Sequence, residues 1–171
     1  MRMSVFAVAL AALVYCVPAY AQEADEWGFY VRADAGWSWT EGWDKDGNAF
    51  VGGGGVGYQF GDWIRADVVV DWSGKYSNLN YWYGFSSFTT VLGNAYLDIP
   101  TGTFITPYVG GGVGSTFAGG DNGFTYDFTG GAAFEITDNM AIDIGYRYIN
   151  IAADHDGITG HQGLAGVRFG F

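Results

Sequence analysis

The sequence predicts an all-β protein, an eight-stranded antiparallel up-and-down transmembrane β-barrel. Three observations predict this fold. Apolar and polar residues alternate with period two along most of the chain, and no helical periodicity of useful length follows the first 21 residues. Glycine (29 residues) and aromatic residues (19%) are both abundant, whereas disordered glycine-rich chains lack aromatics. All four arginines beyond residue 21 fall on the polar faces of the alternating segments.

The first 21 residues have the features of a cleaved signal peptide. Arg2 is followed by an almost wholly apolar run, Met3–Val17. Ala19 and Ala21 then have the small-x-small spacing of a cleavage site. The apolar run is shorter than the ~20 residues that a spanning helix needs. We therefore expect an exported protein with one domain, the barrel, over residues 22–171.

Charge and cysteine content exclude several classes of protein. Cleavage would remove the only cysteine, Cys16, so the mature chain could form neither a disulfide nor a cysteine-ligated metal site. The chain has 18 acidic and only 7 basic residues, and no basic stripe. Because nucleic acids are bound through lysine and arginine that displace counterions from phosphates, we expect no nucleic-acid partner.

The first half of the predicted barrel contains four strands. Residues Phe29–Trp39 alternate aromatic, valine and alanine side chains with polar ones. Phe50–Phe60 is built around glycines, which permit the bends and close approaches of a narrow barrel. Trp63–Trp72 alternates isoleucine, valine and tryptophan with arginine and aspartate, and the fourth strand is placed at roughly Tyr81–Asp98.

The second half contains four more strands. Thr106–Thr116 repeats the glycine-rich pattern of the second strand. Phe124–Thr137 and Met140–Tyr148 each have one apolar face and one face that carries charged residues. The last strand, Leu164–Phe171, ends on an aromatic residue.

The connections alternate in length. Short turns are expected at Gly61-Asp62, Pro100–Phe104 and Asp138-Asn139. Longer polar loops are expected at roughly Thr40–Ala49, Ser73–Asn80, Phe117–Gly123 and Ala152–Thr159. Short turns at one end and longer loops at the other are typical of an up-and-down meander.

The polar faces predict a charged interior. Eight strands enclose a space just wide enough for side chains to fill. The strand carboxylates can accept hydrogen bonds from the four arginines, so that a polar network fills the lumen. The predicted barrel-interior charge network consists of Arg32, Asp34, Arg65, Asp67, Asp71, Asp127, Glu135, Asp143, Arg147 and Arg168.

The apolar faces predict contact with lipid. Broad aromatics stand at both ends of the strands, with small or aliphatic residues between them, as in transmembrane barrels. The loop-end belt is Trp37, Trp39, Phe50 and Trp72, and the turn-end belt is Trp27, Phe60, Trp63, Phe169 and Phe171. Under this assignment we expect an arginine at Val68 to block insertion and an arginine at Thr125 to be milder.

The stretch FVGGGGVGYQF (Phe50–Phe60) contains the dinucleotide-binding pattern G-x-G-x-x-G at Gly52, Gly54 and Gly57. That motif needs a helix that starts within the glycine turn. Another alternating strand follows instead, so we interpret the glycines as barrel residues.

Three segments of the sequence resemble those of a known family. They are TPYVGGGVG (Thr106–Gly114), ITDNMAIDIGYRY (Ile136–Tyr148) and GHQGLAGVRFGF (Gly160–Phe171). They are similar to the small outer-membrane β-barrel proteins of Gram-negative bacteria, the OmpA/OmpX-like, porin-like surface proteins. The resemblance implies a location in the cell outer membrane and a C-terminal assembly signal, here Gly166, Phe169 and Phe171, although a polar residue is usual where Leu164 stands.

The resemblance also implies the partners. They are outer-membrane lipid and lipopolysaccharide, with the barrel-assembly machinery and periplasmic chaperones during biogenesis. It implies a structural role in envelope integrity and surface-loop display. A narrow channel or small-ligand-binding barrel is the first alternative.

The second alternative is a lipid A-modifying enzyme. Acyl hydrolysis would need a nucleophile, a base and an orienting carboxylate. The candidate bases are His155 and His161, and the candidate nucleophiles are Ser38 and Ser115, but nothing in the sequence pairs them. We therefore expect no enzymatic activity.

Two loop segments are candidate binding sites. Asp44–Asn48 partly resembles a calcium loop, but it lacks the alternating acidic ligands and the glutamate at position twelve. The aromatic cluster Tyr81–Phe85 favours a belt or an extended strand over a ligand patch. We expect no cofactor and no metal.

Overall fold

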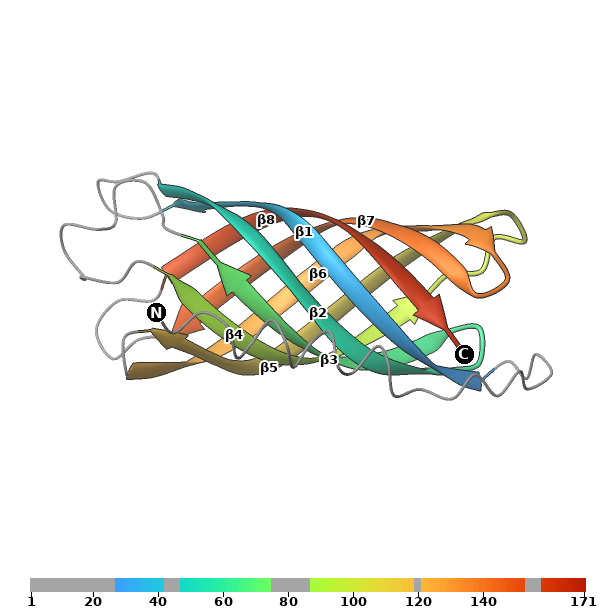
Figure 1. The fold of residues 1–171 in the computed structure, drawn as a ribbon, viewed down its shortest axis with the longest axis horizontal. Helices are drawn as coiled ribbons and strands as arrows, with labels where there is room; N and C mark the ends of the chain where they lie inside the picture. The colour runs from blue at the N-terminus through green and yellow to red at the C-terminus, as the bar shows by residue number, and fades with distance from the viewer. Residues whose placement is uncertain (1–26, 42–46, 75–86, 119–120, 153–157) are drawn as a thin grey trace, which may run out of the picture.

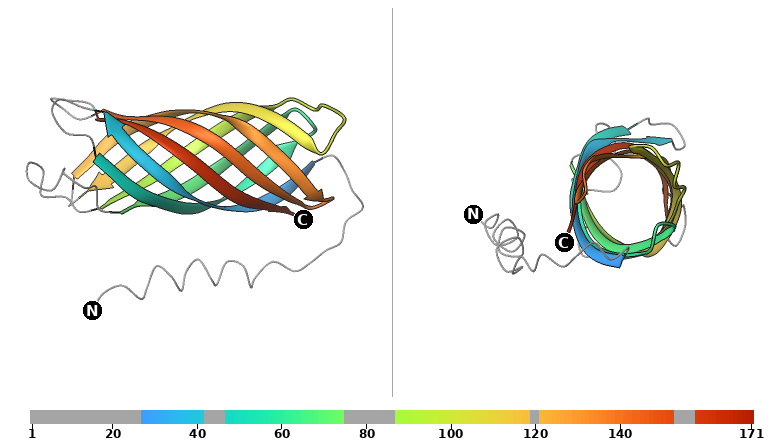
Figure 2. Two further views of the ribbon diagram at one scale, coloured as in Figure 1. Left: turned by 90° about the horizontal axis from the view of Figure 1, so that it is seen from above. Right: turned by 90° about the vertical axis from the view of Figure 1, so that its right-hand side faces the viewer.

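The described part of the chain forms a closed antiparallel barrel of eight strands (Figure 1). The computed structural model describes residues 27–41, 47–74, 87–118, 121–152 and 158–171. Each strand pairs with the next, and β8 pairs with β1 to close the ring (Figure 2). The strands are β1 (Trp27–Glu41), β2 (Gly47–Phe60), β3 (Ile64–Ser73), β4 (Phe88–Asp98), β5 (Ile105–Ala118), β6 (Asp121–Thr137), β7 (Met140–Ala152) and β8 (Ile158–Gly170). The predicted fold class is confirmed.

Several strands are longer than the alternation predicts. β8 begins at Ile158 rather than Leu164, because Gly160 pairs with Thr40 of β1 and with Ile149 of β7. The glycines in this segment hide the period-two pattern, so the sequence does not reveal the first part of the strand. The predicted loop Phe117–Gly123 is likewise shorter, because β5 extends to Ala118 and β6 begins at Asp121. The first part of the predicted strand Tyr81–Asp98 lies outside the described residues, and β4 begins at Phe88.

The three short connections lie where the sequence places them. They span residues 61–63, 99–104 and 138–139. Gly61 and Gly102 adopt positive φ angles of 72° and 69°, a region that favours glycine. The amide of Asp98 donates a hydrogen bond to the Trp63 carbonyl at 2.8 Å, which ties two of the turns together. These contacts define the turn end of the barrel.

The two faces of the sheet differ in exposure as the alternation predicts. In β3 the side chains of Val68 and Val70 are 52% and 46% exposed, while Val69 between them is fully buried. The exposed large side chains around the ring are nearly all apolar, and the buried set contains most of the charged ones. Soluble monomers rarely expose a contiguous apolar patch of more than a few hundred Å², so water does not suit this outer surface. Within the described residues, no helix is long and apolar enough to cross a membrane.

Close approach of strands requires glycine at some inward positions. A Cβ on Gly114 of β5 would lie far inside van der Waals contact with the Val91 carbonyl oxygen and 2.9 Å from the Leu92 Cα, so backbone would have to move. A Cβ on the outward Gly130 of β6 would have the Tyr108 carbonyl oxygen 3.8 Å away, an ordinary contact.

These two glycines give a matched test of packing inside the barrel. Gly114→Ala is expected to destabilise the folded barrel by about 1–3 kcal/mol, because it overpacks a wall that cannot relax. Gly130→Ala is expected to change the free energy of unfolding by no more than about 0.5 kcal/mol. Urea unfolding of both variants in lipid vesicles measures the difference, and equal effects would contradict the inward assignment of Gly114.

Candidate functional site

The barrel interior gathers the charged side chains of the strands. Arg65 and Arg147 are only 1% exposed, and Arg32 is 8% exposed. Strands on every side of the ring contribute carboxylates to this interior: Asp34, Asp67, Asp71, Asp98, Asp127 and Asp143. Among the described residues, six buried aspartates thus face four arginines in the lumen.

Arg32 of β1 is the centre of one cluster. Its Nε and Nη2 both donate to the Asp34 carboxylate at 2.8 Å, and its Nη1 donates to Asp67 Oδ2 at 2.9 Å. The same Nη1 donates to the Tyr96 hydroxyl at 2.9 Å. Asp67 also accepts hydrogen bonds from the Tyr30 hydroxyl and the Asn94 amide. The cluster therefore links β1, β3 and β4 through the lumen.

Arg65 of β3 lies between two tyrosine rings. Its Nε donates to Asp98 Oδ1 at 3.0 Å, and its Cζ lies 4.5 Å and 4.6 Å from the ring centroids of Tyr96 and Tyr108. Rings at such distances stabilise a cation through their π faces. Both Nη atoms are buried without a protein hydrogen bond. Ordered water normally satisfies buried groups of this kind.

Arg147 of β7 reaches across the barrel. Its Nη1 donates to the carboxylate of Asp71 on β3, and three strands separate β7 from β3 in either direction round the ring. Its Nε lies 3.5 Å from Asp127 Oδ2, and Nη1 lies 3.4 Å from the Gln162 amide oxygen. One guanidinium thus connects both walls of the lumen and faces two carboxylates.

The remaining predicted charges are placed less centrally. Arg168 lies 3.5 Å from Asp143 on the neighbouring strand, with its Cζ 5.6 Å from the Tyr30 ring centroid. Glu135 lies on the lumen side of β6 but is exposed at the turn end, where it accepts a hydrogen bond from Thr106 at 3.0 Å. Nine of the ten predicted positions therefore lie in the interior ion-pair network, and Glu135 does not.

Sequence reasoning missed several members of the interior. Asp98 ends the fourth predicted strand, and its alternation with Tyr96 and Asn94 was the available signal. Three tyrosines, Tyr30, Tyr96 and Tyr108, also belong to the interior. The rings of all three lie beside arginines, the Tyr96 hydroxyl accepts from Arg32, and the Tyr30 hydroxyl donates to Asp67. An apolar level of Val69, Leu92 and Ile149 also lies inside, each at most 6% exposed. These three residues carry no charge that would identify them in the sequence, so their grouping follows only from the register of the strands.

The candidate catalytic residues are not brought together. Ser38 is fully buried on the lumen side, whereas His161 lies on the outer side among Trp39, Tyr146 and Tyr148. The Tyr146 hydroxyl and His161 Nδ1 form a hydrogen bond there. Ser115 is on β5, and two strands, β6 and β7, separate it from His161 on β8. Within the described ranges, no three histidine, cysteine or acidic side chains gather where they could hold a metal ion.

The glycines of the G-x-G-x-x-G pattern lie within β2. Gly52, Gly54 and Gly57 pair with residues of β1 and β3, so no helix starts there. Other candidates fall outside the described residues wholly or in part. They are the cleavage residues Ala19 and Ala21, the Asp44–Asn48 loop, the Tyr81–Phe85 cluster and His155.

Comparison with known sequences gives relatives of the same kind. An uncharacterized protein of Brucella abortus (strain 2308) is 25% identical over 141 residues, 57% of this chain and 50% of that protein. The outer membrane protein PagN of Salmonella typhimurium is 32% identical over 80 residues, 36% of this chain and 34% of PagN. The chain thus spans half or less of the length of these relatives.

Solved structures share the barrel fold. Neisserial surface protein A (NspA) superposes with a TM-score of 0.74 at 24% identity, over 84% of this chain and 97% of NspA. The N-terminal β-barrel domain of Pseudomonas aeruginosa OprF gives a TM-score of 0.56 at 16% identity, over 83% of this chain and 97% of that domain. Both are outer-membrane barrels, so the likeness supports the fold.

A family model decides the assignment. The model described as "Outer membrane protein beta-barrel domain" matches residues 7–171, which include every strand of the structure. The apolar outer surface, the closed ring and this match agree with one another. The chain therefore belongs to the outer membrane protein β-barrel domain family and lies in the outer membrane, with lipid around its barrel.

Proposed function

We propose that this protein is a structural component of the outer membrane whose polar interior is closed and whose loops display a surface outside the cell. The observation that carries this proposal is the ion pair between Arg147 and Asp71, which crosses the lumen from β7 to β3. The Arg32 and Arg65 clusters fill the levels nearer the turn end. Long loops of such barrels face outward and short turns face the periplasm, so surface display at the loop end follows.

The level of Val69, Leu92 and Ile149 supports the same proposal. These three side chains are buried inside the barrel and form one apolar cluster. Val69 pairs with Leu92 in the register, one inward position deeper than the Asp71–Thr90 pair. Val69 and Leu92 lie between the Asp71–Thr90 pair and the Asp67–Asn94 pair, so apolar side chains separate two polar levels of the lumen on this wall.

We further propose that the last strand is read during assembly. Phe169 and Phe171 are 43% and 47% exposed on the outer face, and Gly166 lies beside Asp34 on the inner face. The two aromatic side chains therefore face away from the lumen, whereas Gly166 is buried beside the charged interior. Periplasmic chaperones would hold the chain before that step, after cleavage of residues 1–21.

We propose no enzymatic role. Ser38 lies on the lumen side of the barrel wall and His161 on its outer side, so the Ser38 hydroxyl does not meet the His161 imidazole. Mass spectrometry of lipid A from cells with and without the protein tests this proposal. An unchanged spectrum is expected, and a new or missing acyl chain would contradict it.

Planar-bilayer recording tests the closed interior. Purified protein, shown to be folded by a gel mobility that changes on boiling, is expected to give no stable unit conductance at neutral pH. A large porin reconstituted in the same bilayer is the positive control. Stable, solute-selective conductance steps from the folded protein would favour a narrow channel instead.

A further inference from the structure

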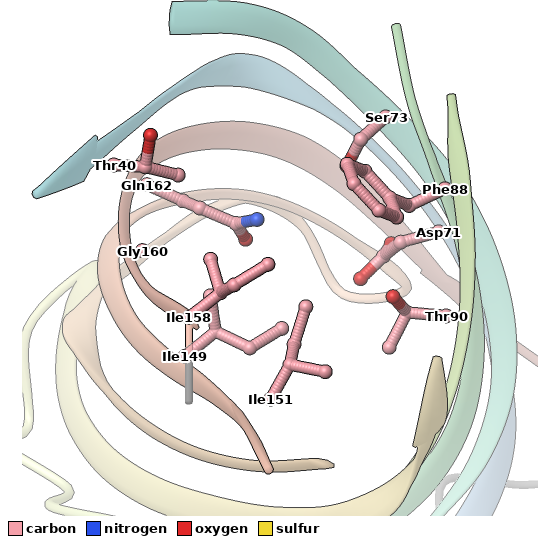
Figure 3. A pocket seen from close by; sticks show the side chains of 10 residues that line it. All are labelled: Thr40, Asp71, Ser73, Phe88, Thr90, Ile149, Ile151, Ile158, Gly160 and Gln162. Atoms are coloured by element: carbon pink, nitrogen blue, oxygen red, sulfur yellow. The ribbon is translucent and has the colours of Figure 1, made fainter. Parts of the chain in front are cut away.

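A pocket opens at the loop end of the barrel interior (Figure 3). Its volume of about 20 Å³ has room for roughly one water-sized group. Asp71 and Thr90 line one side of it, and Gln162 lies on the other side with Ile149, Ile151 and Ile158. These residues come from β3, β4, β7 and β8, so the pocket lies between opposite walls of the barrel.

The carboxylate of Asp71 is the charged group that lines the pocket. Asp71 accepts a hydrogen bond from Arg147 through Oδ2, which uses one of about four lone-pair directions of a carboxylate. The Gln162 amide oxygen faces Arg147 Nη1, and Thr90 shares a hydrogen bond with Thr116 at 2.8 Å. The pocket therefore presents a carboxylate with spare acceptor capacity next to the Thr90 hydroxyl, with the Gln162 amide on the opposite side.

Negative charge exceeds positive charge around the Asp71 side of the pocket. Arg147 is within 3.5 Å of both Asp71 and Asp127, so two carboxylates share one guanidinium. The whole chain carries a formal charge of −11, which raises the concentration of cations near its surface. A positive group entering the pocket would complete a second ion pair with Asp71.

The apolar wall defines the rest of the ligand. Ile149, Ile151 and Ile158 line the side contributed by β7 and β8, and Phe88 lies on the β4 side (Figure 3). Val69 and Leu92 are fully buried and lie one inward position nearer the turn end than Asp71 and Thr90. A ligand must therefore enter and leave at the loop end, with its apolar part along the isoleucines.

We propose that this mouth pocket binds the primary ammonium group of a small organic cation, such as a short alkylamine. The ammonium group is close to a water molecule in size and has three hydrogen-bond donors, one for Asp71. The alkyl tail lies against the isoleucines and points to the loop end. This proposal is independent of whether the barrel conducts.

Methyl NMR of the full barrel in lipid nanodiscs tests the site, because isoleucine methyl groups lie both in the pocket and on the outer face of the barrel. Ile149, Ile151 and Ile158 line the pocket, while Ile64, Ile142 and Ile144 face outward at 51%, 38% and 54% exposure. Titration with n-butylamine hydrochloride at pH 7 is expected to shift the pocket methyls saturably and leave the outward methyls unchanged. n-Butanol should bind about tenfold more weakly, since it lacks the charge-assisted hydrogen bond, and sodium butyrate should not bind.

Three kinds of result overturn the proposal. Equal shifts with butanol and butylamine would remove the role of the carboxylate. Equal saturation by potassium chloride would identify a site for a bare monovalent cation without a tail. Shifts confined to Ile64, Ile142 and Ile144 would place the amine in the lipid instead.

Variants separate the pocket from the ion-pair network. Asp71→Asn is expected to lose the tenfold preference for the amine. Because this change alters a buried ion pair and the barrel could fail to fold, Ile151→Trp provides a second variant that fills the pocket and leaves Asp71 intact. It should abolish the shifts of Ile149 and Ile158, whereas Ile144→Trp on the outer face should leave them unchanged. Saturable shifts that persist in Ile151→Trp would overturn the site.

Discussion

Val68→Arg is expected to prevent stable insertion of the barrel. Val68 stands at the middle of the outward set of β3 and is 52% exposed to the surrounding lipid. An arginine near the bilayer midplane of a transmembrane barrel costs about 2–4 kcal/mol. That is a large share of the stability of a small domain. The fraction of protein with heat-modifiable gel mobility after folding into vesicles measures the effect, and it should fall close to zero.

The matched control lies on the same strand and the same face. Ile64 begins β3 near the turn end and is 51% exposed, so it differs from Val68 in depth rather than in exposure. The cost of arginine falls to about 0–1 kcal/mol near the interface. Ile64→Arg should therefore fold nearly as well as the wild type. If both variants insert equally well, the outer surface of β3 does not meet hydrocarbon.

Thr125 is a poor control for this experiment, contrary to the expectation from the sequence. Its side chain is fully buried in the lumen, and its hydroxyl shares a hydrogen bond with Thr116 at 2.8 Å. An arginine there would have to displace packed neighbours. Inward polarity was predictable from alternation, but the space available at an inward position was not.

The face of each strand residue was predictable because the two sides of the sheet meet different media. A charge in hydrocarbon is costly, so Arg32, Arg65 and Arg147 had to point inward once their segments were strands. Alternation likewise placed Val68 outward and Asp67 inward. Those assignments need only the period-two geometry of a strand and the preference of each side chain for a medium.

The partners of the charges were not predictable from the same pattern. Alternation gives no register round the ring, and so does not reveal that Arg147 meets Asp71 on the opposite wall. Nor does it show which level of the lumen is apolar, because Ile149 has the inward parity of Arg147 and only the register groups it with Val69 and Leu92. Glu135 has the inward parity of Asp127, yet it lies at the exposed turn end. The mouth pocket also depends on register and therefore escaped sequence reasoning.

Arg147→Met is expected to destabilise the barrel by about 3–5 kcal/mol. The guanidinium is 1% exposed and is shared by Asp71 and Asp127, so its removal leaves two buried carboxylates without their counter-ion. Breaking a buried pair from one side is costly for that reason, even where the intact pair adds little net stability. Equilibrium unfolding by urea in lipid vesicles, followed by the fluorescence of the protein's tryptophans, measures the change.

A double variant distinguishes uncompensated charge from lost packing. Adding Asp71→Asn to Arg147→Met removes one of the stranded carboxylates, so it should restore about 1–3 kcal/mol, the coupling typical of side chains in direct contact. Ile144→Met, on the outer face of the same strand at 54% exposure, should change the free energy of unfolding by less than about 0.5 kcal/mol. If Asp71→Asn restores nothing, the cost of Arg147→Met comes from the lost side-chain volume. In that case the cross-barrel ion pair contributes little to holding β3 and β7 together.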